Sequence, residues 1–265
     1  MSEASELMET CAEAARRGGA VLRARFGGRR VIDYKGGIDL VTDADRASEE
    51  AVVGFLRAGH PAAAILAEES GQSGSEDAAL RFVVDPLDGT TNYAHGLPHF
   101  AVNVAAMDAR GVVAGATLDP LRGELFLAAR GEGATCNGER IQVSRTPELV
   151  RALLVTGFPY DVHQNYEMPL RIFGEYMRRA RAIRRMGAAA LDLAYVACGR
   201  FDGYWEMRLK PWDLAPGILL VREAGGLVAD FDGGDDMLRR GDICAANHDL
   251  QGRLLAVLAE VRRGL

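Results

Sequence analysis

Apolar residues recur at helical spacing in some stretches of the chain and form short or alternating runs in others. The first such stretch, residues 4–26, ends at Gly27-Gly28 and predicts a packing helix on the face of Leu7, Met8, Cys11, Ala14, Ala15, Val21 and Leu22. The same spacing predicts helices over residues 43–58, 167–180, 188–198, 212–224 and 248–261. Strands are expected over residues 63–67, 81–84, 100–105, 112–118, 124–128, 153–157, 201–206, 227–231 and 243–246.

The order of these elements indicates the fold class. Residues 100–128 alternate strands with glycine turns, which predicts an antiparallel meander, whereas the second half alternates strands with helices. An α/β (α+β) protein with layered, mixed or antiparallel sheets follows. Thr146-Pro147 is the expected boundary between an N-terminal half, residues 1–145, and a C-terminal half, residues 146–265, packed as one catalytic unit.

Composition narrows the function classes. The 265 residues are 48% hydrophobic and 26% charged, with a net charge of −6, which argues against a surface built to neutralise nucleic-acid phosphates. The four cysteines have no CxxC spacing, so reduced thiols are expected. The acidic start of the chain lacks the pattern of a signal peptide, and no apolar run approaches membrane-spanning length. We therefore expect a cytoplasmic protein.

Carboxylates follow two of the predicted strands. The run 81–84 leads into Asp85 and Asp88, and the run 63–67 leads into Glu68-Glu69. Ligands of open α/β sheets gather at strand ends, so one shared pocket at one sheet edge is expected. Clustered carboxylates repel unless a cation lies between them, and hard oxygen ligands suit Mg²⁺ or Mn²⁺. For Asp85-Pro86-Leu87-Asp88-Gly89 alone, an ordinary Asp-Gly turn is the competing interpretation.

Other polar residues allow more than one interpretation. The link 33–39 is expected to be mobile and able to fold over a site, although its Lys35 is equally explained as a solvated lysine. His95 and His99 are expected to be structural or solvent-facing. Trp212 is expected to pack and fix Asp213. Arg184 and Arg185 are interpreted as reaching an anionic substrate, a dimer partner or solvent, and solvent is the commonest case.

Four motifs together resemble those of the inositol monophosphatase family. In chain order they are Asp39-Leu40-Val41-Thr42-Asp43-Ala44-Asp45, Glu68-Glu69-Ser70, Asp85-Pro86-Leu87-Asp88-Gly89-Thr90-Thr91-Asn92, and Trp212-Asp213-Leu214-Ala215-Pro216-Gly217 with Glu223-Ala224-Gly225-Gly226. The resemblance implies an αβαβα sandwich and a homodimeric, lithium-sensitive, Mg²⁺-dependent phosphomonoesterase with two to three metals, or Mn²⁺ in their place.

The resemblance also assigns roles to residues. It implies metal ligation by Glu68, Asp85, the carbonyl of Leu87, Asp88 and Asp213, and a catalytic set of Asp45, Thr90 and Glu68. Substrate contacts are implied for Gly89, Thr90, Ala189, Glu206 and Asp213. Pro216 stands where alanine is usual, in what is expected to be the first turn of its helix.

Three departures from the family pattern leave the substrate open. Ala188 replaces a hydroxyl residue, and Phe158 and Lys210 stand where some relatives have a small polar residue and histidine. The implied substrate is myo-inositol 1-phosphate or a similar small polyol phosphate. Histidinol phosphate, fructose 1,6-bisphosphate, NADP(H) and 3′-phosphoadenosine 5′-phosphate are the alternatives. A regulatory binding module on a phosphatase fold is the hypothesis from a different class.

Overall fold

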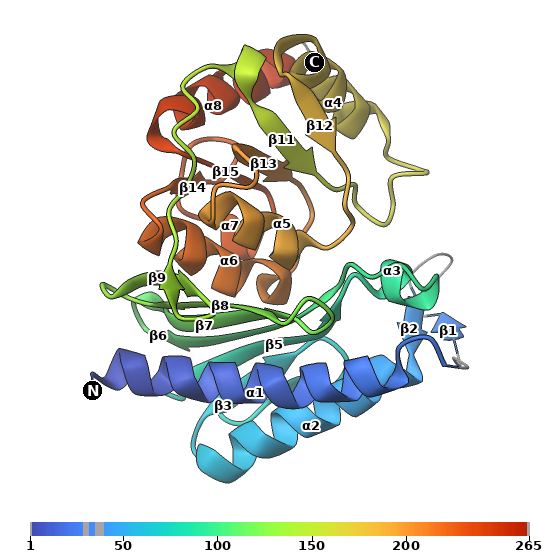
Figure 1. The fold of residues 1–265 in the computed structure, drawn as a ribbon, viewed down its shortest axis with the longest axis vertical. Helices are drawn as coiled ribbons and strands as arrows, with labels where there is room; N and C mark the ends of the chain where they lie inside the picture. Colours follow the sequence, from blue (N-terminus) through green and yellow to red (C-terminus); the bar gives the residue numbers. More distant parts are fainter. Residues whose placement is uncertain (1, 29–31, 35–39, 264–265) are drawn as a thin grey trace.

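Five layers of secondary structure stack along the long axis of the molecule (Figure 1). The computed structural model describes residues 2–28, 32–34 and 40–263. Helices α1 (Glu3–Arg25) and α2 (Asp43–Gly59) cover the outer face of the first sheet. Helices α5 (Ala189–Ala197) and α6 (Pro211–Glu223) lie between the two sheets, and α4 (Glu167–Arg179) and α8 (His248–Arg263) cover the second. The αβαβα order and the mixed α/β class are confirmed.

The first sheet places two acidic segments side by side. Its strand order is β10-β9-β8-β7-β6-β5-β3-β4, and only β3 and β5 pair in parallel. Ala67 pairs with Val84, so Glu68 and Asp85 follow at the same edge, as expected from the sequence. The strands are β3 (Ala64–Ala67), β4 (Gly71–Ser73), β5 (Arg81–Asp88), β6 (Ala101–Asp108), β7 (Gly111–Asp119), β8 (Glu124–Ala129), β9 (Gly133–Cys136) and β10 (Glu139–Arg140).

The second sheet lies wholly in the C-terminal half. Its order is β12-β11-β13-β15-β14, with β11 parallel to β12 and β13 and the other pairs antiparallel. The strands are β11 (Leu153–Thr156), β12 (Ala182–Arg184), β13 (Gly203–Glu206), β14 (Leu227–Ala229) and β15 (Ile243–Ala246). Thr146 falls in the connection between β10 and β11, and the division of the chain there into two halves stays a prediction.

Several short elements are not predicted by the hydrophobic pattern. They are β1 (Ile32–Tyr34), β2 (Leu40–Thr42), β4, β9, β10, β12, α3 (Thr90–Ala94), α7 (Met237–Arg240) and the 3-10 turn Leu149–Arg151. Each spans only two to five residues, and most lack the run of apolar residues that marks strands of similar length such as β15. The prediction that the link around Lys35 folds over the site falls on residues 35–39, outside the described part of the chain.

Helix α6 is buried on nearly all sides because it lies between the sheets. Its residues 214–221 are buried, and a Cβ at Gly217 would lie 2.5 Å from Leu193 of α5. The sequence-based position of Pro216 is wrong: the helix begins at Pro211, so Pro216 lies in its second turn. There Pro216 packs on β7, where a Cβ at Gly115 would lie 2.9 Å from the proline Cα.

Candidate active site

A cavity of about 260 Å³ opens where the first sheet, α5 and α6 meet. Residues from both halves of the chain line it: Glu68, Asp85, Leu87, Asp88, Gly89, Thr90, Thr91, Gly157, Phe158, Pro159, Tyr160, Arg185, Gly187, Ala188, Ala189, Glu206, Met207, Arg208, Leu209, Lys210, Trp212 and Asp213. The volume lies just below the range that is usual for small-molecule sites, about 300 to 1,000 Å³. The cavity is therefore suited to a small substrate.

Three carboxylates converge in this cavity. Asp85, Asp88 and Asp213 each place an oxygen within 4.8 Å of the others. In a regular strand, residues 85 and 88 would face opposite sides, but the pairing of β5 with β6 shifts register between them. Asp213 joins them as the third residue of α6. Hard oxygen donors at this spacing can hold Mg²⁺ or Mn²⁺.

A backbone N–H fixes each of these carboxylates. The N–H of Leu87 donates to Asp85 at 3.0 Å, and the N–H of Lys210 donates to Asp213 at 2.7 Å. The third donor is the N–H of Ala190, in the first turn of α5, which lies 2.8 Å from Asp88 Oδ2. The carboxylates are therefore held in place by short-range and long-range contacts alike.

Burial and mutual repulsion disfavour the charged forms of the group. Burial raises the pKa of Asp85 well above its usual range, and the charges of Glu68, Asp88 and Asp213 raise it further. Burial and the charge of Asp213 do the same for the pKa of Asp88, and burial raises the pKa of Asp213 to about 6. Glu68 lines the same cavity. A bound cation would remove this repulsion.

Thr90 and Asp45 form a hydrogen-bonded pair beside the carboxylates. Thr90 Oγ1 lies 3.1 Å from Asp45 Oδ1 and 3.0 Å from the carbonyl of Leu87. Asp45 is buried at the start of α2, where Thr42 donates to its other oxygen from both its N–H and its hydroxyl. Burial raises the pKa of Asp45, and the hydrogen bonds from Thr42 and Thr90 oppose this.

The turn from β5 into α3 needs a glycine. Gly89 has a φ of +89°, and a Cβ there would lie 3.1 Å from the carbonyl of His99 and 3.2 Å from that of Gly187. Asn92 in α3 ties the same segments together by donating to the carbonyls of His99 and Met186, both at 2.9 Å. The amides that open α3 are thus held at the cavity wall.

Glu206 occupies the wall formed by the second sheet. Tyr204 Oη donates to Glu206 Oε2 at 2.7 Å, and burial raises the pKa of Glu206 to about 7. A Cβ at position 157 would lie 2.2 Å from the Glu206 carboxylate, so a side chain there would displace Glu206. Ala188 and Ala189, at the start of α5, also line the cavity.

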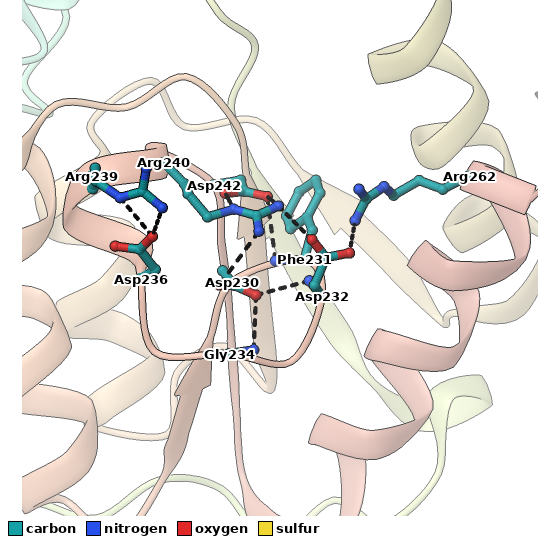
Figure 2. Close-up of polar contacts among 9 residues, drawn as sticks. All are labelled: Asp230, Phe231, Asp232, Gly234, Asp236, Arg239, Arg240, Asp242 and Arg262. Carbon is teal, nitrogen blue, oxygen red and sulfur yellow. Dashed lines mark hydrogen bonds and ion pairs between the residues drawn. The ribbon is translucent and has the colours of Figure 1, made fainter.

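The outer wall between β13 and α6 is held by an ion-pair network. Leu209 donates its N–H to the carbonyl of Gly241 at 2.8 Å, where α7 ends. Figure 2 shows Arg240, the residue before Gly241, reaching Asp230, Asp232 and Asp242 from one guanidinium group. This network fixes the segment that supports Leu209 and Lys210.

Sequence reasoning missed or left open several site residues. The Ala190 N–H contact and Asn103, whose amide donates to the carbonyl of Trp212 at 2.7 Å, depend on long-range packing that no motif reveals. Arg185 lines the cavity, whereas Arg184 does not. His95 is exposed, His99 is buried against Tyr195, and neither lines the cavity.

Comparison with known proteins gives one consistent result. The model of the inositol monophosphatase family matches residues 3–263. The Nus factor SuhB of Pseudomonas aeruginosa is 47% identical over 220 residues, which cover 82% of this chain and 81% of that protein. Among solved structures, the extragenic suppressor protein suhB of Bartonella henselae is similar with a TM-score of 0.91 and 42% identity, covering 96% of this chain and 98% of that one. An inositol monophosphatase from Anabaena is similar with a TM-score of 0.90 and 39% identity, covering 98% and 97%.

Proposed function

The chain belongs to the inositol monophosphatase family, and from this premise we propose that it is a Mg²⁺-dependent phosphomonoesterase. Its proposed substrate is myo-inositol 1-phosphate or a similar small polyol phosphate. One observation carries the proposal: Asp85, Asp88 and Asp213 converge in the same cavity as the Thr90–Asp45 pair. Clustered, buried carboxylates cost stability, and a metal site gives a reason for them.

The residues of the cavity fit two to three Mg²⁺ ions, or Mn²⁺. We assign Glu68, Asp85 and the carbonyl of Leu87 to a first ion, and Asp85, Asp88 and Asp213 to a second. A weaker third ion would be held by Glu68 through water. Bound there, the ions would lower the pKa of a water molecule, offset the phosphate charge and stabilise the departing alkoxide.

The chain's own residues orient the reaction. Thr90 Oγ1, whose proton is directed to Asp45, accepts a proton from the attacking water, and Glu68 helps to position that water. The water oxygen bonds to phosphorus as the ester P–O bond breaks, and the departing alkoxide takes a proton from a solvent water molecule to leave as the alcohol. The amides of Gly89 and Thr90 donate to phosphate oxygens.

The substrate alcohol would contact the C-terminal half. Glu206 accepts hydrogen bonds from its hydroxyl groups, and Ala189 and Asp213 contact the same portion of the molecule. Because all phosphate esters present the same group to the metals, these walls decide specificity. Histidinol phosphate, fructose 1,6-bisphosphate, NADP(H) and 3′-phosphoadenosine 5′-phosphate are the alternatives.

A substrate panel at millimolar Mg²⁺ tests the proposal. The comparison of kcat/KM should rank myo-inositol 1-phosphate or another polyol phosphate first. Failure of purified protein to release phosphate from every member would refute the enzyme assignment. A higher kcat/KM for one of the alternatives would identify that compound as the substrate and leave the proposed reaction unchanged.

A second proposed role is that of a binding or regulatory protein. It rests on the name of the Pseudomonas aeruginosa relative, a Nus factor. The Asp85→Asn variant separates the two roles, because it removes a shared metal ligand and leaves the surface unchanged. A partner captured from lysate by both this variant and the wild type supports binding without catalysis. Loss of the partner in the variant would tie the interaction to the active site.

We propose three further properties. A homodimer and inhibition by lithium rest on the resemblance alone, and a cytoplasmic location is the expectation from the sequence. Light scattering of the purified protein tests the first, and phosphate release at increasing LiCl tests the second. The described helices are each too short or too polar to traverse a bilayer.

A further inference from the structure

Three basic residues line the outer part of the candidate active site. Arg185 lies between β12 and α5, and Arg208 and Lys210 lie between β13 and α6. Arg208 has a φ of +64°, a left-handed backbone that is rare outside glycine and that is found preferentially at functional sites. The cations are thus placed by the two segments that enclose the alcohol side of the cavity.

The charge of Arg208 is already matched. Its guanidinium forms an ion pair with Asp161, which also accepts from Asn165 at 2.7 Å. Arg185 and Lys210 differ, because both are exposed and neither forms an ion pair with a carboxylate in residues 2–28 and 42–263. The charges of Arg185 and Lys210 are therefore not matched by an ion pair with these residues.

The remaining charges of the lining leave a positive surplus. Four of its carboxylates, Glu68, Asp85, Asp88 and Asp213, belong to the proposed metal site. Outside that set and the Arg208 pair, the lining holds one carboxylate, Glu206, against Arg185 and Lys210. With a neutral polyol bound, this surplus would face solvent and the longer-range charges of Glu206 and Asp213.

We propose that Arg185 and Lys210 form an anion-recognition pair that selects substrates with a second anionic group on the alcohol. That group is a carboxylate or a second phosphate, bound beside the ester that is cleaved. The inference rests on the proposed phosphatase function. It favours, over the neutral polyol phosphates, those alternative substrates that carry a second anion, such as fructose 1,6-bisphosphate and 3′-phosphoadenosine 5′-phosphate. Guanidinium and ammonium donors recognise these oxyanions through charge-assisted hydrogen bonds.

Glycerol 3-phosphate and 3-phosphoglycerate test the pair directly. They share a three-carbon chain and a phosphate ester, and differ in that one has a hydroxymethyl group where the other has a carboxylate. The wild type should show the higher kcat/KM on 3-phosphoglycerate. The ratio of the two kcat/KM values should fall about tenfold in Arg185→Gln and again in Lys210→Gln.

Matched variants make the result specific. Arg185→Lys and Lys210→Arg keep the charges and should retain most of the preference. Arg208→Gln removes a cation that is already paired and should leave the ratio unchanged. Substitution of the Lys210 side chain keeps the backbone N–H that holds Asp213, and thermal melting of each variant checks the fold.

Two outcomes would overturn the inference. One is a wild type without preference for 3-phosphoglycerate, and the other is a ratio that is the same in the wild type and in the Arg185→Gln/Lys210→Gln double variant. Calorimetric Kd values for both compounds in Mg²⁺ distinguish failure of the anion-recognition pair from failure of the proposed phosphatase activity. If neither compound is hydrolysed, the phosphatase assignment fails on these substrates, and the ratio of Kd values still decides whether the pair recognises the carboxylate.

Discussion

The side-chain amide of Asn103 in β6 donates to the backbone carbonyl of Trp212 at 2.7 Å. In a regular helix that carbonyl would accept from the N–H of residue 216, but residue 216 is proline and has none. Thr117 orients Asn103 by donating to its side-chain oxygen at 2.6 Å. The first sheet thus supplies the hydrogen bond that Pro216 cannot, next to the metal-ligand candidate Asp213.

Replacement of Asn103 by Leu should destabilise the protein and weaken Mg²⁺ binding. The change leaves the carbonyl of Trp212 without this donor, which costs roughly 1–3 kcal/mol for a buried group. Urea unfolding and Mg²⁺ calorimetry measure the two effects. In the Pro216→Ala background the restored helical N–H should reduce the cost, and an equal cost in both backgrounds would contradict the compensation.

Replacement of Asp88 by Asn should have opposite effects with and without metal. Burial and the charge of Asp213 raise the pKa of Asp88, so removal of the charge should stabilise the metal-free protein. In Mg²⁺ the same variant should gain less stability from the ion than the wild type does. Unfolding in EDTA and in Mg²⁺ gives both values; lower stability of the variant in EDTA would argue against repulsion.

Mg²⁺ affinity should fall as the pH drops through about 6. The pKa of Asp213 is raised to about 6 by burial, and burial also raises those of Asp85 and Asp88, so protons compete with the ion below these pKa values. Calorimetry at pH 6 in two buffers with different ionisation enthalpies should reveal proton release. Identical enthalpies in both buffers would rule out this competition.

Two replacements of Thr90 should distinguish a catalytic role of its hydroxyl group from a structural role of the residue. Thr90→Ser keeps the group that bonds Asp45 and should retain most of kcat, whereas Thr90→Ala should lower kcat about 100-fold or more. Steady-state kinetics at saturating Mg²⁺ gives the comparison. Equal kcat values in the two variants would remove Thr90 from proton transfer.

Asp192 in α5 predicts a pH-dependent stability. It is 1% exposed, and neither carboxyl oxygen has a hydrogen-bond partner among the described residues. Burial raises its pKa well above the usual value, so its neutral form is favoured in the folded state. The stability that the folded state gains from neutral Asp192 is fully present below the unfolded pKa of about 3.9. It is lost as the pH rises toward the pKa of Asp192 in the folded protein.

The Asp192→Asn variant should therefore gain stability over the wild type as the pH rises from 4 to 8. Urea unfolding across this range measures the difference. Asp119→Asn is the matched control, because Asp119 is equally buried but pairs with Arg122 at 2.6 Å. That variant should lose stability at neutral pH. A pH-independent difference for Asp192→Asn would show that its carboxyl is ionised in the folded protein.

Periodicity and motif order explain how much of this molecule is predictable. The eight-residue β5 and the long α1 and α2 have enough repeats to be recognised, and the acidic ends of β3 and β5 indicate a shared edge. Contacts such as Ala190 to Asp88, 102 residues apart, depend on how the two sheets enclose α5. The apolar run that predicts α5 also conceals Asp192, because one carboxylate does not alter its pattern.

The most direct test of the proposed Mg²⁺-dependent hydrolysis compares the wild type with Asp85→Asn. It measures phosphate release from myo-inositol 1-phosphate as a function of Mg²⁺ concentration. The side-chain oxygen of the introduced asparagine can still accept the N–H of Leu87, so the fold should survive, but one charge shared by both proposed ions is gone. We expect saturable, Mg²⁺-dependent release by the wild type and none above background in the variant. Near-normal release by folded Asp85→Asn, or release by the wild type in EDTA, would contradict the proposed hydrolysis.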